Sequence, residues 1–324
     1  MLTTIPPQAP QPSRRAFWAR RLQALALLSV LGLLLPLPSH LLAASSGAVA
    51  WLLDLTSHWQ WLFLLGLLLA GGLATWLDKR WAILLLAAPL PWLTASSPAP
   101  GSEAHGPVFS VASANVSLHN QDPQALALWL AQERPDVVIV LEVSPDYAVA
   151  LQPLRDYPFQ QLVPQDGPFG IALLSRHPLR QVQVIEDADA IAHIQAQVQW
   201  QNQLIGLIAV HPMPPLSAHY HSVRNAKLRA LARQASASKL PTVLAGDLNA
   251  TPWSSAFSGL AQHGLRRASG LAPTWPAALH GLLGIPLDHV LVTPHWGVVS
   301  RQVGPDLGSD HLPVLLRLSL RDAD

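Results

Sequence analysis

Residues 241–249, PTVLAGDLN, decide the fold class, because they join an apolar strand to a polar end. The stretch from Thr242 to Gly246 has the composition of a strand buried on both faces. Asp247 and Asn249 follow, and a spacing of two places their side chains on one face of an extended chain. The pattern predicts an α/β protein with a functional site at its strand ends.

Similar stretches on both sides of this strand extend the prediction to residues 107–320. We expect further strands at 108–115, 136–142, 169–175, 181–185, 194–200, 204–210, 287–292, 298–303 and 312–320, and helices at 122–133, 222–237 and 254–263. The strand–helix–strand beginning implies a parallel pair, and the consecutive strands that follow imply antiparallel pairing. Together they predict a sandwich of mixed sheets with helices outside.

The first 97 residues have a different character. Runs of 32, 23 and 22 residues without Asp, Glu, Lys or Arg lie between Arg21 and Asp54, between Asp54 and Asp78, and between Arg80 and Glu103. A bilayer-spanning helix needs about 20 apolar residues. We therefore expect an all-α membrane anchor of about three transmembrane helices at 1–97, with a Pro/Gly/Ser linker at 98–106.

The basic residues of the anchor predict its orientation. Arg14, Arg15, Arg20 and Arg21 precede the first run, and Lys79 and Arg80 join the second run to the third. Positive-inside bias then places the N-terminus inside and the C-terminal domain outside, which in a bacterium means a multi-pass inner (cytoplasmic) membrane protein with a periplasmic domain. Two questions stay open, namely whether Gly47–Leu55 forms an interfacial helix or a fourth span, and whether the first run is a cleaved signal peptide.

Composition excludes several other classes. Charged residues make up 12% of the chain, about half of the usual share, which argues against disorder and against a typical cytosolic enzyme. The absence of cysteine excludes disulfide frameworks, cysteine zinc sites and thiol nucleophiles. No Asp, Glu, Lys or Arg lies inside the three runs, so a transporter is disfavoured.

Several predicted strands of the C-terminal domain end on a polar residue, and this repetition is more informative than any one of them. The residues are Asn115, Glu142, His211, Asp247, Asn249, Asp288, Asp310 and His311. A single Asp or Asn at such a position is commonly a turn cap. Polar groups gathered over the edge of a rigid sheet are how α/β enzymes build sites.

The segments DVVIVLEV, FGIALLSRHPL, VLAGDLN, IPLDHVLV and GSDHLPV occur in this order in the chain. This succession resembles the motifs of the endonuclease/exonuclease/phosphatase superfamily, and its membrane-bound bacterial branch in particular. The resemblance implies a four-layer sandwich of two mixed β-sheets flanked by helices. It also implies a hydrolase that cleaves phosphoesters with a divalent metal ion, Mg²⁺ or Mn²⁺.

The resemblance further implies a role for each residue. Glu142 is expected to bind the metal, assisted by Asn115 and Asp310, because carboxylate and amide oxygens suit a hard cation. Asp247 is expected to position and deprotonate the attacking water while Asn249 contacts the phosphate. His311, oriented by Asp288, and His211 are expected at the phosphate or the leaving oxygen.

The sequence leaves the substrate open among nucleic acid, phospholipid and small phosphate esters, and between diesters and monoesters. Residues 98–324 carry 14 basic and 17 acidic residues, a net charge of −3, which lowers non-specific affinity for nucleic acid. Ser117 stands where nucleases of the family often carry an acid, so a second metal is doubtful. The alternative function is a non-catalytic binding module, tethered to the lipid bilayer, that retains the fold.

Overall fold

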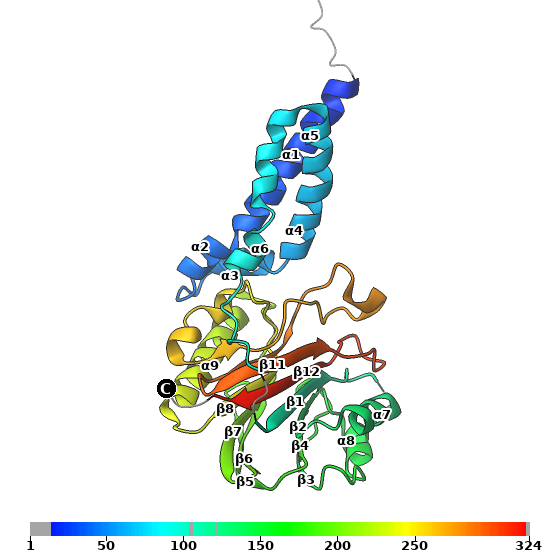
Figure 1. The fold of residues 1–324 in the computed structure, drawn as a ribbon, viewed down its shortest axis with the longest axis vertical. Helices are drawn as coiled ribbons and strands as arrows, with labels where there is room; N and C mark the ends of the chain where they lie inside the picture. Colours follow the sequence, from blue (N-terminus) through cyan, green and yellow to red (C-terminus); the bar gives the residue numbers. More distant parts are fainter. Residues whose placement is uncertain (1–13, 104–105, 121, 322–324) are drawn as a thin grey trace, which may run out of the picture. The chain divides into compact units, whose positions relative to one another are not determined.

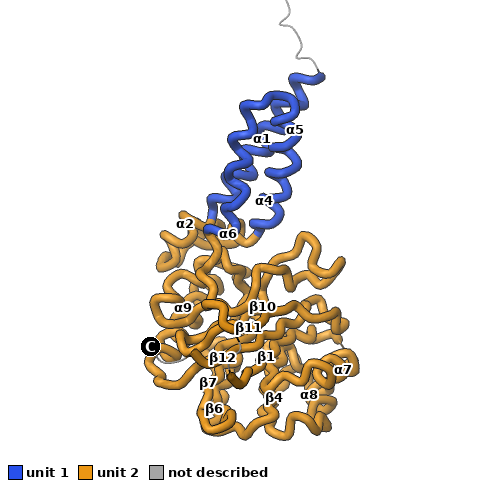
Figure 2. Tube along the Cα trace, viewed as in Figure 1, with its two compact units in different colours: residues 1–35, 59–93 blue, residues 36–58, 94–324 orange. Residues whose placement is uncertain are grey.

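The computed structural model describes residues 14–103, 106–120 and 122–321. The chain divides into two compact units, and each is described by itself. Unit 1 comprises Met1–Leu35 and Trp59–Leu93, and unit 2 comprises Pro36–His58 and Thr94–Asp324 (Figure 2). Each unit is therefore discontinuous in sequence.

Unit 1 is helical. It contains α1 (Arg14–Leu34), α4 (Gln60–Gly66), the π-helical turn η1 (Leu67–Gly71), α5 (Gly72–Leu77), the 3₁₀ helix η2 (Lys79–Ala87) and most of α6 (Leu90–Thr94). Two helical stretches are long and apolar enough to cross a membrane, Arg14–Leu41 and Gln60–Leu77. The third apolar run forms η2 and α6, and each is shorter than a span. Large apolar side chains such as Leu31, Leu69 and Trp76 are exposed, as on helices that contact lipid.

Residues 36–58, which include the end of the first stretch, belong to unit 2. They form the short helices α2 (Pro36–Leu41) and α3 (Ala48–Ser57), and α3 packs against α9 (Ala218–Ala237) of the same unit. The sequence left open whether a further span begins at Gly47. In the structure Gly47 is the N-cap of α3, a helix of ten residues.

Residues 98–103, the described beginning of the predicted linker, pair with unit 2. The amide of Ala99 donates to the carbonyl of Arg267, and the amide of Ser102 donates to the carbonyl of Val298. Ala99 is buried. This part of the linker is a paired segment of unit 2.

Unit 2 is built on two six-stranded mixed sheets (Figure 1). The first has the order β11 (Trp296–Val303), β12 (Val314–Leu320), β1 (Val108–Asn115), β2 (Val137–Leu141), β4 (Ile171–Ser175) and β3 (Phe159–Val163). The second has the order β5 (Leu179–Glu186), β6 (Ala192–Trp200), β7 (Gln203–Val210), β8 (Thr242–Asp247), β10 (Asp288–Val292) and β9 (Arg266–Arg267). β1 and β2 are parallel, as are β7 and β8, and the other pairs are antiparallel.

Alternating side chains of the strands supply separate apolar layers. Phe109 and Val111 of β1 belong to the core shared by the two sheets, whereas Ala112 and Ala114 pack with α7 (Gln124–Glu133) and α8 (Pro145–Leu151). On the second sheet, Leu244 of β8 packs with residues of α9. The period of two along each strand thus produces a helix–sheet–sheet–helix sandwich, and the predicted four-layer fold is confirmed.

Three local predictions need adjustment. The helix predicted at 254–263 is wrong, because this stretch forms two 3₁₀ turns, η3 (Ser255–Phe257) and η4 (Ala261–His263). Between them Gly259 adopts a φ of +79°, which an α-helix cannot contain. Helix α7 begins at Gln124, two residues later than expected, and the strand β3 and helix α8 were not predicted. A further 3₁₀ element, η5 (Ala278–Gly281), precedes β10.

Candidate active site

Strand register brings the polar residues together in pairs. Asp247, at the end of β8, is paired directly with Asp288, at the start of the antiparallel β10. Asn115 ends β1 and is paired with Leu141 of the parallel β2, so Glu142 follows at the same sheet edge. Two carboxylates therefore meet across one sheet, and an amide meets a carboxylate across the other.

Asp247 is the centre of the site. Its Oδ2 lies 3.5 Å from Nε2 of His211, 3.7 Å from Nε2 of His311 and 3.4 Å from Nδ2 of Asn115. All four side chains are buried. Asp247 thus joins residues from both sheets into one polar cluster.

His311 is held by a carboxylate, as the sequence analysis predicted. Its Nδ1 lies 2.9 Å from Oδ2 of Asp288, and its own amide donates to Oγ of Ser309. Asp288 is fixed in turn by Thr274, whose hydroxyl accepts the amide of Asp288 at 3.2 Å. This arrangement orients the imidazole so that its Nε2 faces Asp247.

Asn249 lies in a sharp turn directly after β8. Its backbone has a φ of +48°, a left-handed conformation that Asn adopts more readily than most residues. Its amide donates to Oδ1 of Asp247 at 2.8 Å, and its Nδ2 donates to the carbonyl of Pro212 at 3.1 Å. The turn therefore fixes Asn249 and Asp247 relative to each other.

Glu142 and Asn115 form the second half of the site. Nδ2 of Asn115 donates to Oε1 of Glu142 at 2.9 Å, and the amide of Leu118 donates to Oε2 of Glu142 at 2.9 Å. Glu142 itself has a φ of +61°, a conformation that is uncommon for a residue of this type and that clusters at functional sites. Glu142 is half-buried, so its carboxylate remains accessible to a ligand.

The donor set fits a hard divalent cation. Asp247, Asp288 and His311 form a group of three ligating side chains whose candidate atoms lie within 4.8 Å of one another. Within the described part of the chain, Oδ1 of Asp288 and Nδ1 of His211 are buried without a hydrogen-bond partner. Carboxylate and amide oxygens, such as those of Glu142 and Asn115, suit Mg²⁺ or Mn²⁺ better than softer metals.

Burial and neighbouring charges shift the pKa values of Asp247, Asp288 and His311 in different directions. Burial disfavours an ionised Asp247, but His311 and His211 outweigh it, and the pKa of Asp247 falls below its usual value. Burial, reinforced by the nearby Asp247, raises the pKa of Asp288. Burial opposes protonation of His311, yet Asp288 and Asp247 overcome it and raise the pKa of His311. The cluster accordingly combines an ionised carboxylate with a protonated imidazole.

Asp310 is the exposed neighbour of His311, and its negative charge is one of the causes that raise the pKa of His311. Its side chain is exposed, and its Oδ2 accepts a hydrogen bond from Nε1 of Trp275 at 3.1 Å. Because Asp310 and His311 are adjacent in sequence, their side chains diverge. The structure thus brings seven of the eight predicted residues into the two halves of the site, and it places Asp310 against Trp275.

Three supporting residues were not assigned a role from sequence. Thr274 holds the amide of Asp288, Oγ of Ser309 donates to the carbonyl of Asn115 at 2.8 Å, and the ring of Phe169 lies 5.5 Å from that of His211. Thr274 begins the segment Thr274-Trp275-Pro276, and Ser309 lies in the GSDHLPV motif, so both residues stand in recognisable parts of the sequence. Their contacts join segments that are far apart in the sequence, and a local sequence pattern cannot predict such contacts.

Comparison with known proteins gives one family match. The model of the Endonuclease/Exonuclease/phosphatase family matches residues 112–311. These residues include every predicted site position from Asn115 to His311. No curated protein matches the chain by sequence.

Solved structures share the fold. The endonuclease/exonuclease/phosphatase from Beutenbergia cavernae DSM 12333 is 22% identical, covering 66% of this chain and 72% of its own, with a TM-score of 0.55. TDP2 from D. rerio, complexed with single-strand DNA product, is 17% identical, covering 66% and 100%, with a TM-score of 0.56. The 3′ phosphatase NExo from Neisseria, bound to a product DNA hairpin, is 21% identical, covering 66% and 99%, with a TM-score of 0.53.

Proposed function

Because the chain belongs to the Endonuclease/Exonuclease/phosphatase family, whose members hydrolyse phosphoester bonds, we propose that it is a membrane-anchored, divalent-metal-dependent phosphodiesterase. One observation carries the proposal, namely that Asp247 contacts His211, His311 and Asn115 at the junction of the two sheets. A binding module without catalysis has no need to keep a carboxylate between two histidines. Hydrolysis of a phosphoester can use such a combination, with the carboxylate as base for the attacking water and the histidines as donors to the phosphate.

Glu142, assisted by Asn115, would hold Mg²⁺ or Mn²⁺. The metal ion would supply charge neutralisation at the phosphate and lower the pKa of bound water. The carboxylate of Asp310 is exposed and accepts from Trp275, so the proposal does not depend on it as a ligand.

The remaining side chains act on the proton and on the phosphate. Asp247 accepts the proton of the attacking water, since its ionised carboxylate lies beside both histidines. Nε2 of His311, with Asp288 at its other nitrogen, donates to a phosphate oxygen or to the leaving oxygen. His211 and Asn249 complete the set of donors around the phosphate.

The anchor and the charge favour a substrate close to a bilayer. Two helical stretches of the chain satisfy the length and composition of membrane spans, and we propose, from the positive-inside bias of the sequence, that unit 2 faces the outer side. The net charge of −3 over residues 98–324 does not favour a long polyanion. We propose a phospholipid head group or a small phosphodiester ahead of nucleic acid.

The test uses the full chain purified in detergent. It is assayed with Mg²⁺ or Mn²⁺ against bis(p-nitrophenyl) phosphate, phospholipid vesicles, DNA and a phosphomonoester in parallel. Metal-dependent turnover that is lost in Asp247→Asn and His311→Ala supports the proposal. Turnover that survives both substitutions contradicts the mechanism, and an intact chain without turnover on any substrate favours the binding module.

A further inference from the structure

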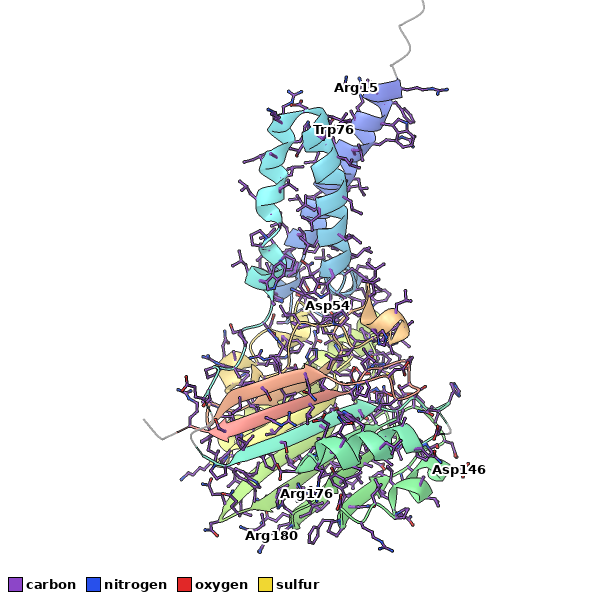
Figure 3. The ribbon with its side chains drawn as sticks, turned by 45° about the vertical axis from the view of Figure 1, so that its right-hand side comes forward. Arg15, Asp54, Trp76, Asp146, Arg176 and Arg180 are labelled. Atoms are coloured by element: carbon purple, nitrogen blue, oxygen red, sulfur yellow. The ribbon has the colours of Figure 1, made fainter. Side chains whose placement is uncertain are left out.

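A buried ion pair joins α3 to α9 within unit 2. Nη2 of Arg224 lies 2.6 Å from Oδ2 of Asp54, and both side chains are fully buried. Asp54, labelled in Figure 3, stands 170 positions before Arg224 in the chain. Neither residue belongs to the catalytic set described above.

The carboxylate of Asp54 is saturated with contacts. It accepts hydrogen bonds from the amide of Ser255 at 2.6 Å and from Oγ of Ser254 at 2.9 Å. His221 lies 3.5 Å from Oδ2 of Asp54, and His58 lies 3.6 Å from it. A buried carboxylate with this many partners has a fixed position.

The same guanidinium reaches the active site. Nη1 of Arg224 donates to the carbonyl of Asn249 at 2.6 Å, while Nη2 contacts Asp54. The planar fork of Arg presents both donors in a fixed relation. The carbonyl of Asn249 is therefore tied to Asp54 through one rigid group.

The neighbouring backbone is held by the same segment. Residues 251–253 follow Asn249, and Nδ1 of His58 lies 2.9 Å from Oγ1 of Thr251. Nε2 of His40 lies 3.1 Å from the carbonyl of Trp253, which also accepts from Oγ of Ser57 at 3.3 Å. The segment 36–58 thus fixes the loop that continues from the turn of Asn249.

We propose that Asp54 is a positioning residue of the active site, acting through Arg224 on the backbone of Asn249. The left-handed turn at Asn249 is the element that needs this support, because its conformation is less favourable than an extended one. The segment 36–58 thereby completes the catalytic unit. The inference rests on the proposed function, since its readout is the turnover of a phosphodiester.

The experiment compares three variants of the full chain in detergent, using Mg²⁺ and bis(p-nitrophenyl) phosphate. Asp54→Asn removes the charge that fixes Arg224. Arg224→Lys keeps a cation for Asp54 but lacks the second arm of the fork. Asp187→Asn is the matched control. Oδ2 of Asp187 lies 2.8 Å from Nζ of Lys227, which is also on α9, and this ion pair does not contact Asn249.

We expect kcat to fall by about tenfold or more in Asp54→Asn and Arg224→Lys, with KM changed by less than about threefold. Asp187→Asn is expected to stay within about twofold of the wild type. Circular dichroism and thermal unfolding are measured for each variant, and kcat is compared only at temperatures at which all variants are folded. If Asp54→Asn does not fold, Arg224→Lys alone decides.

The outcomes separate the two proposals. Wild-type kcat in folded Asp54→Asn and Arg224→Lys overturns the positioning role, whatever their unfolding temperatures. A lowered unfolding temperature with wild-type kcat assigns the pair to stability alone and also overturns it. An inactive wild type, by contrast, contradicts the proposed function and not the geometry of the pair.

Discussion

Nδ1 of His311 lies 2.9 Å from Oδ2 of Asp288, although Asp288 begins β10, His311 lies in the loop before β12, and the two residues are 23 positions apart. The carboxylate fixes the ring orientation and favours the imidazolium form. The opposite nitrogen of His311 is thereby directed at Asp247. In the proposed mechanism, Asp288 therefore acts on the substrate through His311.

Replacing Asp288 by Asn is expected to lower kcat by about a hundredfold, because the amide no longer favours a protonated His311. Steady-state kinetics with a phosphodiester under saturating metal measures the effect. Asp306→Asn, which changes an exposed carboxylate five positions before His311, provides the control. An Asp288→Asn variant with wild-type kcat would show that His311 works without its carboxylate.

Replacing Glu142 by Gln is expected to raise the Mg²⁺ concentration for half-maximal activity by about tenfold or more, since a neutral amide binds a hard cation weakly. A titration of activity with Mg²⁺ measures the shift. Asp146→Asn is the control, because Asp146 is exposed on α8, four positions further (Figure 3). An unchanged Mg²⁺ titration of Glu142→Gln would remove Glu142 from the metal site.

Chelation is expected to abolish activity and to lower the midpoint of thermal unfolding, because a ligand that binds the folded state stabilises it by mass action. Calorimetry with and without EDTA, followed by re-addition of Mg²⁺, tests both effects. Full activity in excess chelator would exclude the proposed metal dependence.

The ion pair of Asp54 predicts a dependence of stability on pH. Burial disfavours the ionised form, but His58 and Arg224 outweigh it and hold the pKa of Asp54 well below its usual value. Its contribution to stability is therefore complete well above the unfolded value of about 3.9, and it is lost as the pH falls through and below that value.

The difference in unfolding free energy between the wild type and Asp54→Asn is accordingly expected to shrink by about 1 kcal/mol between pH 6 and pH 3. Denaturant unfolding of both proteins in the same detergent measures it, with Asp146→Asn as the control for an exposed carboxylate. A difference that is constant over this range would mean that Asp54 has an ordinary pKa in the folded protein.

Gly246 allows the close approach of β8 and β7 next to Asp247. A Cβ atom at this position would lie 1.8 Å from the carbonyl oxygen of Val210, and the φ of Gly246 is +154°. Gly246→Ala is expected to reduce the free energy of unfolding by at least about 2 kcal/mol. Gly167→Ala, at a position with no atom within 4 Å of the added Cβ, should change it little. Equal stability of the two variants in denaturant unfolding would contradict this packing.

The sequence was sufficient to find the residues that the structure gathers in the candidate site, because they lie at or next to the ends of strands whose apolar pattern is clear. Asp247 after VLAG and Glu142 after VVIVL are examples, and strand ends in one sheet meet at one edge. The edge strand β3 escaped prediction because FQQLV is half polar. Helix 254–263 was wrongly predicted because Gly259 interrupts it with a positive φ.

The support for Asn249 could not be predicted in the same way. Asp54 is a lone acid between two uncharged runs, a pattern that equally suits a charge in a loop between membrane helices. Arg224 lies on a helix with several other basic residues. Only the tertiary structure pairs the two, because no local periodicity relates positions 170 residues apart.

The distance in sequence between Asp54 and Arg224 has a consequence for how the protein is made. At about 5–20 residues per second, the ribosome adds Arg224 roughly 10–30 s after Asp54, since 170 positions separate them. Throughout this interval α3 exists without the cation that neutralises its carboxylate, and the catalytic unit cannot close until α9 has been synthesised. The early part of the chain must therefore wait for its late partner, and the proposed active site can form only after α9 has left the ribosome.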